Sequence, residues 1–167
     1  MDQPTNLQEV FGECAPRLLR YGYQLSHDAQ RAQDLVQEAV VSALRYQNGR
    51  VIHAWEPYLR TTMTRCYLDR ARTAASREFA VPDLPETHQP QPGLEQQVVN
   101  RDVIWVGLQT LPVTQRTALV LRYYLDLDDE QIATEIGCRP ATVRSLLHRG
   151  LRVLKSKDQL WAGGQSR

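Results

Sequence analysis

The stretch from Leu127 to Lys155, LDDEQIATEIGCRPATVRSLLHRGLRVLK, divides into two short amphipathic segments separated by a glycine. The first segment is acidic, and the second is basic. Two helices joined by a tight turn that contains glycine form a helix-turn-helix, whose second helix enters the major groove of DNA. This stretch therefore predicts a helical fold and a nucleic-acid partner.

Local signals mark the ends of both predicted helices. Asp128 suits the N-cap of the first helix, and Gln131, three residues later, can complete a capping box. Gly137 can adopt the left-handed backbone that ends this helix, and Pro140 suits the first turn of the next. Apolar residues spaced by three and four predict the buried face of the second helix, which consists of Val143, Leu147, Leu151 and Leu154.

The opposite face of the second helix is polar and basic. It presents Thr142, Ser145, Arg149 and Arg152, flanked by Arg144 and His148. Arginine can donate two hydrogen bonds to guanine or bind phosphates, so this face suits a DNA groove. A solvated basic helix is the alternative, but the agreement of caps, turn and basic face favours DNA binding. Arg139 occupies the N-cap, where Ser, Thr, Asp or Asn is preferred.

The rest of the chain also reads as helical, with one interruption. Three segments before residue 79 carry apolar residues at helical spacing. Four prolines then fall between Ala80 and Gly93, where such a density favours extended chain over helix. We predict an all-α chain with two small helical domains (residues 1–78 and 94–160). A Pro-rich linker (79–93) joins them, the second contains the helix-turn-helix, and a flexible tail (161–167) follows.

Composition excludes several classes of protein. The 167 residues carry a net charge of only +1, so any basic surface must be local. Three widely separated cysteines favour a reducing compartment, and no apolar run approaches the roughly 20 residues of a membrane span. We therefore expect a cytoplasmic location and no membrane insertion. The four histidines lack metal-ligand spacing and no nucleotide-binding or hydrolase motif occurs, so we expect no metal, no cofactor and no enzymatic activity.

Two further patterns are ambiguous by themselves. Asp34, Gln37, Glu38 and Val41 follow the spacing of one exposed helix face, which an ordinary solvated surface would also explain. The third helix and its approach mix aromatic residues with arginines: Trp55, Tyr58, Tyr67, Arg60, Arg65, Arg70 and Arg72. Rings that stack on unpaired bases and arginines that bind phosphates would suit single-stranded nucleic acid. A buried Tyr58 beside solubilising arginines explains the pattern equally well.

Four segments together resemble a bacterial sigma factor of the extracytoplasmic-function (ECF) group, close to the actinobacterial sigma-E family. They are RAQDLVQEAVVSAL (31–44), EPYLRTTMTRCYLDRAR (56–72), LPVTQRTALVLRYYLDLDDEQIATEIG (111–137) and ATVRSLLHRGLRVLK (141–155). The resemblance covers nearly the whole chain except the linker and the tail. It implies that the first domain is sigma region two and the second is sigma region four.

The resemblance also implies a role for each surface. Asp34, Leu35, Gln37, Glu38 and Val41 would dock on the clamp helices of the largest subunit of core RNA polymerase. The flap of the beta subunit would be a further partner of the protein. Asn48, Trp55, Tyr58, Arg60, Thr61, Thr64 and Arg65 would melt the minus-10 element of promoter DNA and hold its non-template strand. Arg139, Thr142, Arg144, Ser145, His148 and Arg149 would read the minus-35 element. The linker would then run through the channels of the polymerase, and an anti-sigma factor is a further candidate partner.

The chain departs from the family pattern at three positions. Arg65 stands where many relatives carry asparagine, Gln33 replaces a common acidic residue, and Arg139 replaces a capping residue. The alternative function is a stand-alone helix-turn-helix regulator whose N-terminal domain senses a ligand or dimerises. Such a regulator would bind a specific duplex tightly without polymerase, whereas a sigma factor would need the core enzyme.

Overall fold

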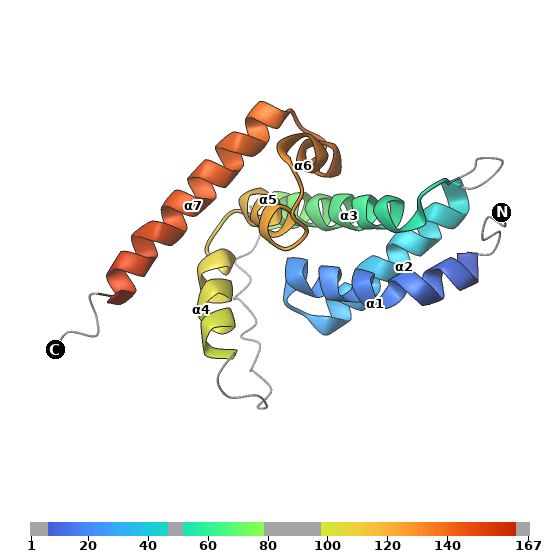
Figure 1. Cartoon of the computed structure of the whole chain (residues 1–167), viewed down its shortest axis with the longest axis horizontal. Coiled ribbons are helices and arrows are strands. Elements are labelled where there is room, and N and C mark those ends of the chain that lie inside the picture. The colour runs from blue at the N-terminus through green and yellow to red at the C-terminus, as the bar shows by residue number, and fades with distance from the viewer. Residues whose placement is uncertain (1–6, 47–51, 79–97, 163–167) are drawn as a thin grey trace.

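The computed structural model describes residues 7–46, 52–78 and 98–162, and these residues form helices and no strand (Figure 1). The predicted all-α fold is therefore confirmed. None of these helices is both long enough and apolar enough to cross a membrane. The helices are α1 (Leu7–Ser26), α2 (Ala29–Tyr46), α3 (Trp55–Glu78), α4 (Val98–Gln109), α5 (Val113–Tyr123), α6 (Asp129–Ile136) and α7 (Pro140–Ala162).

The first three helices pack together around a shared apolar core. Leu18 and Leu25 of α1, Leu35 and Ala39 of α2, and Leu59 and Met63 of α3 are almost fully buried. The helices approach closely at Gly22, where an added Cβ would lie 3.0 Å from the Cα of Ala32. The buried face of α2 runs from Ala32 to Ala43, whereas Leu44 is exposed near the end of the helix.

The starts of α2 and α3 are built differently. Asp28 accepts a hydrogen bond from the backbone N–H of Arg31 at 3.0 Å and so caps the start of α2. The helix α3 begins at Trp55, so Pro57 occupies its third position. Proline is tolerated there because the first N–H groups of a helix have no partner within the helix.

The helix-turn-helix is formed by α6 and α7. The Asp128 carboxylate accepts from the Gln131 N–H at 2.8 Å, and the Gln131 amide oxygen accepts from the Asp128 N–H at 3.0 Å. Gly137 ends α6 with φ of +78°, in the left-handed region. The capping box and the glycine turn are thus confirmed. Because α7 continues to Ala162, the predicted tail overlaps its last turn. The predicted linker (79–93) and residues 163–167 lie outside the described residues.

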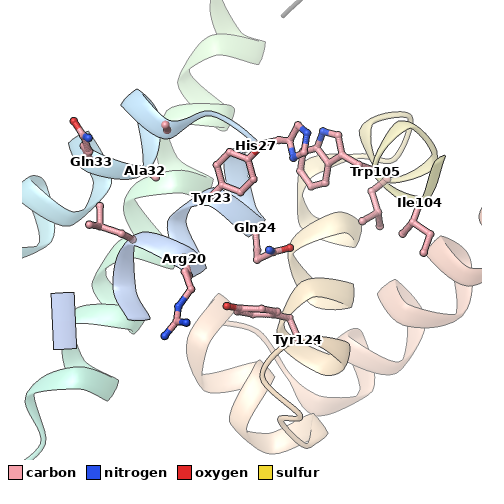
Figure 2. A pocket seen from close by; sticks show the side chains of 12 residues that line it. Arg20, Tyr23, Gln24, His27, Ala32, Gln33, Ile104, Trp105 and Tyr124 are labelled. Atoms are coloured by element: carbon pink, nitrogen blue, oxygen red, sulfur yellow. The ribbon is translucent and has the colours of Figure 1, made fainter. Parts of the chain in front are cut away.

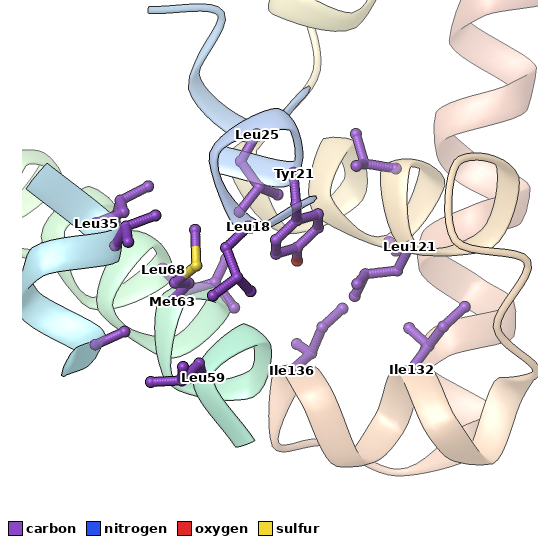
Figure 3. Close-up of a cluster of buried hydrophobic side chains, with 14 of the residues drawn as sticks. Leu18, Tyr21, Leu25, Leu35, Leu59, Met63, Leu68, Leu121, Ile132 and Ile136 are labelled. Atoms are coloured by element: carbon purple, nitrogen blue, oxygen red, sulfur yellow. The ribbon is translucent and has the colours of Figure 1, made fainter. Parts of the chain in front are cut away.

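The two halves of the chain pack against each other. One continuous cluster of buried side chains runs from the first three helices into α5 and α6 (Figure 3). Tyr21 and Met63 of the first half lie in the same cluster as Leu121, Ile132 and Ile136 of the second. The helix α6 packs on α3, and α5 contacts α1 and α3, whereas α7 packs on α4, α5 and α6 and points away from the first half (Figure 1).

A groove of about 740 Å³ runs between the two halves along α1, α4 and the end of α5 (Figure 2). The ring of His27 stacks on the indole of Trp105 with centroids 4.4 Å apart, and Tyr23 lies beside His27. Tyr124 lines the same groove. Aromatic side chains from both halves therefore meet at this seam as well.

Candidate nucleic-acid interface

The basic face of α7 is open to solvent along its first half. All six residues predicted to read the minus-35 element have exposed side chains: Arg139, Thr142, Arg144, Ser145, His148 and Arg149. The opposite side of the helix supplies the packing, with Val143 fully buried and Gly150 close to the Leu119 side chain. A helix held from behind with a free basic face has the geometry that major-groove binding requires.

One acidic residue of α6 orients this face, and sequence reasoning missed it. The Asp129 carboxylate forms an ion pair with Arg122 of α5, and its second oxygen lies 3.7 Å from the Arg144 guanidinium of α7. Asp129 is only partly exposed, whereas Arg144 is mostly exposed. Asp129 therefore lies between side chains of three helices, close to Arg144 at the start of the basic face. Its only signal in the sequence is an acid in the first turn of α6, where the helix dipole favours one.

The predicted polymerase-docking face lies on the outer side of α2. Gln37 and Val41 are exposed, and Asp34 and Glu38 are partly exposed. The carboxylate of Glu38 pairs with Arg70 of α3 at 2.5 Å. The prediction is wrong for Leu35 as a surface contact, because it is 1% exposed and belongs to the core beneath this face. Leu35 can support the docking face only from below.

The residues predicted to hold the opened strand differ in how exposed they are. Trp55, Tyr58 and Thr61 are partly exposed, and Arg65 is exposed. The ring centroids of Tyr58 and Tyr46 are 5.7 Å apart. Asn48 lies outside the described residues. These side chains make an amphipathic surface on the first turns of α3, as a base-stacking site would need.

The remaining two residues of that set, Arg60 and Thr64, face α6. The Arg60 guanidinium donates two hydrogen bonds to one carboxylate oxygen of Glu135, at 2.9 and 3.1 Å. Thr64 is fully buried, so the structure contradicts its expected exposure: its hydroxyl lies 2.7 Å from that of Tyr21 and 3.5 Å from Glu135. Burial raises the pKa of Tyr21, so its hydroxyl stays protonated and available for this hydrogen bond.

The sequence carries a local signal for the burial of Glu135. Ile132, Glu135 and Ile136 follow the spacing of one helix face, and the structure buries all three. An acid in the apolar stripe of a short helix needs a buried cationic partner, because a lone buried carboxylate is strongly disfavoured. The partner, Arg60, is 75 positions away and could not be inferred from local spacing.

Comparison with known proteins identifies the fold and its parts. Residues 10–77 match the Sigma-70 region 2 family, and residues 101–154 match the Sigma-70, region 4 family. The RNA polymerase sigma-E factor of Streptomyces coelicolor is 30% identical over 158 residues, covering 94% of this chain and 88% of that protein. The ECF RNA polymerase sigma factor SigL of Mycobacterium tuberculosis is 29% identical over 157 residues, covering 89% and 86%.

Solved structures agree with this assignment. The sigma factor RpoE of Bartonella quintana superposes with a TM-score of 0.61 at 22% identity, covering 89% of this chain and 94% of that one. The ECF sigma factor SigJ of Mycobacterium tuberculosis superposes with a TM-score of 0.60 at 25% identity, covering 88% of this chain and 52% of that one. The helical arrangement is therefore shared with sigma factors across nearly the whole chain.

Regions 2 and 4, in this order on one chain, define the sigma-70 class of RNA polymerase subunits. Within that class, the chain belongs to the ECF sigma factors, which direct transcription initiation by RNA polymerase. The alternative of a stand-alone regulator is not favoured, because its sensing or dimerising domain would have to occupy the part of the chain that matches region 2.

Proposed function

We propose that the two halves of this sigma factor divide promoter recognition between them. Residues 1–78 bind core polymerase and open the minus-10 element, and residues 94–160 bind the duplex at the minus-35 element, with residues 79–93 as the connection. The observation that carries this proposal is the exposed basic face at the start of α7, which is backed by the buried Val143 and the partly buried Leu147. Each DNA contact is weak alone, and attachment of both halves to one polymerase makes them act together.

The docking site for the polymerase is the outer face of α2. Asp34 and Glu38 supply negative charge, and Val41 supplies an exposed apolar contact that is 45% accessible. A mixed acidic and apolar surface suits a basic helical partner, since opposite charges steer association and apolar contact adds affinity. We assign this face to the clamp helices of the largest polymerase subunit, and we include the flap of the beta subunit among the partners of the chain.

The strand-holding site is the start of α3. Trp55 and Tyr58 offer rings on which unpaired bases can stack, while Arg60 and Arg65 can bind phosphates. Strand opening then follows from tighter binding to single-stranded bases than to the duplex, so the chain itself breaks no bond. This role requires no metal, cofactor or enzymatic activity of the chain.

The setting and partners follow from this role. A subunit that binds polymerase and promoter DNA works in the cytoplasm, where both are present in bacteria. We include an anti-sigma factor among the partners, because the sigma factor RpoE of Bartonella quintana was solved in complex with the anti-sigma factor NepR.

In vitro transcription tests the proposal directly. Purified core polymerase and genomic DNA fragments are incubated with and without the protein, and start sites are mapped. We expect defined starts that appear only when both core and protein are present. Tight binding to a specific duplex without core, and no new start sites with it, would instead support the stand-alone regulator.

A further inference from the structure

Asp129 lies next to the exposed basic face of α7, although it belongs to α6. Its carboxylate is paired with Arg122 of α5, and its second oxygen lies 3.7 Å from Nη1 of Arg144. The side chains of Asp129 and Arg122 are 26% and 28% exposed, whereas that of Arg144 is 67% exposed. A partly buried ion pair between α5 and α6 therefore places a negative charge beside one arginine of the face that we assign to the minus-35 element.

The contact between Asp129 and Arg144 acts through charge and not through a hydrogen bond. A separation of 3.7 Å exceeds the usual donor–acceptor distance of about 2.7–3.2 Å. Because the carboxylate attracts Nη1, it leaves the other two nitrogens of the guanidinium, Nε and Nη2, for DNA. An exposed pair of this kind adds little to the free energy of unfolding, so its main consequence is the orientation of Arg144.

The carboxylate of Asp129 also affects which part of DNA Arg144 can bind. A phosphate carries a full negative charge, so Asp129 opposes the binding of a phosphate at Arg144. The edge of a base in the major groove carries only partial charges, and a carboxylate repels it much less. Asp129 therefore shifts the balance at Arg144 from phosphates, which carry no sequence information, toward bases, which do.

The place of Arg144 on α7 suits a contact with a base. The helix begins at Pro140, so Arg144 lies in its second turn, and the N-terminal residues of a recognition helix are those that reach base edges. Thr142 and Ser145 beside it are exposed and short, so they do not fill the space that the arginine needs. Among the four bases, only guanine offers two acceptors, O6 and N7, to the paired donors of an arginine.

We propose that Asp129 is a positioning residue, which directs Arg144 away from DNA phosphates and toward a guanine in the minus-35 element. This role rests on the proposed function for the identity of the DNA site. The orientation of Arg144 by Asp129 is a property of the free chain and can be measured without DNA. Arg122 contributes indirectly, because its ion pair with Asp129 connects the carboxylate to α5.

Selection by the holoenzyme from promoter fragments with a randomised minus-35 element tests the role of Asp129. Asp129→Asn removes the charge, and Glu130→Gln is the matched control, because it removes an exposed charge from the next residue of α6. We expect Asp129→Asn to lower the preference for guanine at one position about two- to fivefold, the effect of one exposed ion pair. Its retention of DNA without promoter sequence should rise about twofold, since one repulsive charge is lost. Glu130→Gln should keep the guanine preference.

Arg144→Ala identifies the position that Asp129 controls. It should lower the guanine preference at that position about tenfold to a hundredfold, and adding Asp129→Asn should then change the preference no further. A purely structural role of Asp129 would instead weaken selection at every position and lower the retention of all DNA. Asp129→Ser, which keeps an oxygen acceptor for Arg122, replaces Asp129→Asn if that variant fails to fold. A guanine preference that a folded Asp129 variant leaves unchanged would overturn the role.

Nuclear magnetic resonance of the free full-length protein separates this role from the proposed function. The Nε–H group of Arg144 should be more ordered than that of Arg152, which is also exposed on α7, and Asp129→Asn should remove the difference. That result, together with a holoenzyme that selects no minus-35 sequence, would keep the orientation of Arg144 and reject the proposed function. Equal order of Arg144 in Asp129→Asn and the original protein, with normal promoter selection by the original protein, would reject the positioning role and keep the proposed function.

Discussion

The helices α3 and α7 both carry arginines that we assign to promoter DNA, yet the structure treats them differently. On α7 every predicted DNA-contacting side chain is exposed, although Arg144 lies 3.7 Å from the Asp129 carboxylate of α6. On α3, by contrast, Arg60 is paired with Glu135, and the hydroxyl of Thr64 is hydrogen-bonded to that of Tyr21. The surface of α7 that we assign to the duplex is thus accessible to solvent, whereas the surface of α3 that we assign to the opened strand is partly covered by α6.

This difference matches what each surface would bind. Duplex DNA is always present in the cell, and a short basic helix alone binds it weakly, so leaving α7 free has little consequence. Single-stranded promoter DNA exists only when polymerase has opened it. A strand-holding surface that becomes available only on the polymerase would avoid unproductive binding to other single strands.

The largest effect is expected at the docking face, which both DNA surfaces depend on. Replacing Asp34 and Glu38 together with lysine should weaken core binding about a hundredfold or more, because like charges would face a basic partner. Fluorescence titration with purified core measures the affinity. Lysine at the exposed Glu9 and Glu13 of α1 makes the same charge change elsewhere and should have little effect. Equal loss in the two variants would reject the docking face.

Promoter recognition by the exposed surface of α7 should depend on individual side chains. Arg149→Ala should reduce promoter-specific transcription by roughly tenfold to a hundredfold, the range expected for losing one good contact to a base. Lys155→Ala, at an exposed position further along the same helix, is the control. A nuclease footprint over the minus-35 element that stays unchanged in Arg149→Ala would remove this residue from the reading set.

A substitution in the strand-holding surface of α3 should impair a later step of initiation than a substitution in α7. Trp55→Ala should lower promoter opening roughly tenfold, because one stacking platform for a base is lost, while closed-complex binding changes little. Permanganate reactivity of promoter thymines reports the opening. His53→Ala removes an exposed neighbouring side chain and should behave like the original protein. Unchanged permanganate reactivity in Trp55→Ala would show that its ring holds no base.

The smallest effect concerns α6, which forms the first helix of the helix-turn-helix and also packs on α3. Asp128→Ala removes the capping box and should lower the free energy of unfolding by about 1 kcal/mol. Thermal unfolding should show this as a melting temperature lower by roughly 2–4 °C. Ser156→Ala, which removes a hydroxyl that donates to the Val153 carbonyl within α7, serves as the control. Equal melting temperatures for the two variants would mean that the cap contributes nothing.

Local chemistry made the helix-turn-helix predictable. Asp128, Gln131 and Gly137 act over three or four residues, so their sequence positions alone define the hydrogen bonds that the structure contains. The exposure of Arg149 follows from the burial of Val143 by helical periodicity. These features need no knowledge of the rest of the chain.

Long-range pairing explains what the sequence could not predict. The burial of Thr64 depends on Tyr21 and Glu135, which are 43 and 71 positions away. The burial of Leu35, by contrast, follows from helix periodicity within α2, although its stretch resembles a docking motif. The packing of α6 on α3 also joins segments on either side of the proline-rich stretch, across which no periodic pattern extends.

The distance between the two halves, measured in the free protein and on the polymerase, tests the account most directly. Fluorophores attached at Arg45 of α2 and Arg152 of α7, both exposed, would report it by resonance energy transfer. We expect high transfer in the free protein and a fall in transfer when core polymerase binds, as the separation grows by tens of ångströms to fit the promoter. Equal transfer in the free protein and in a transcriptionally active complex would contradict the account.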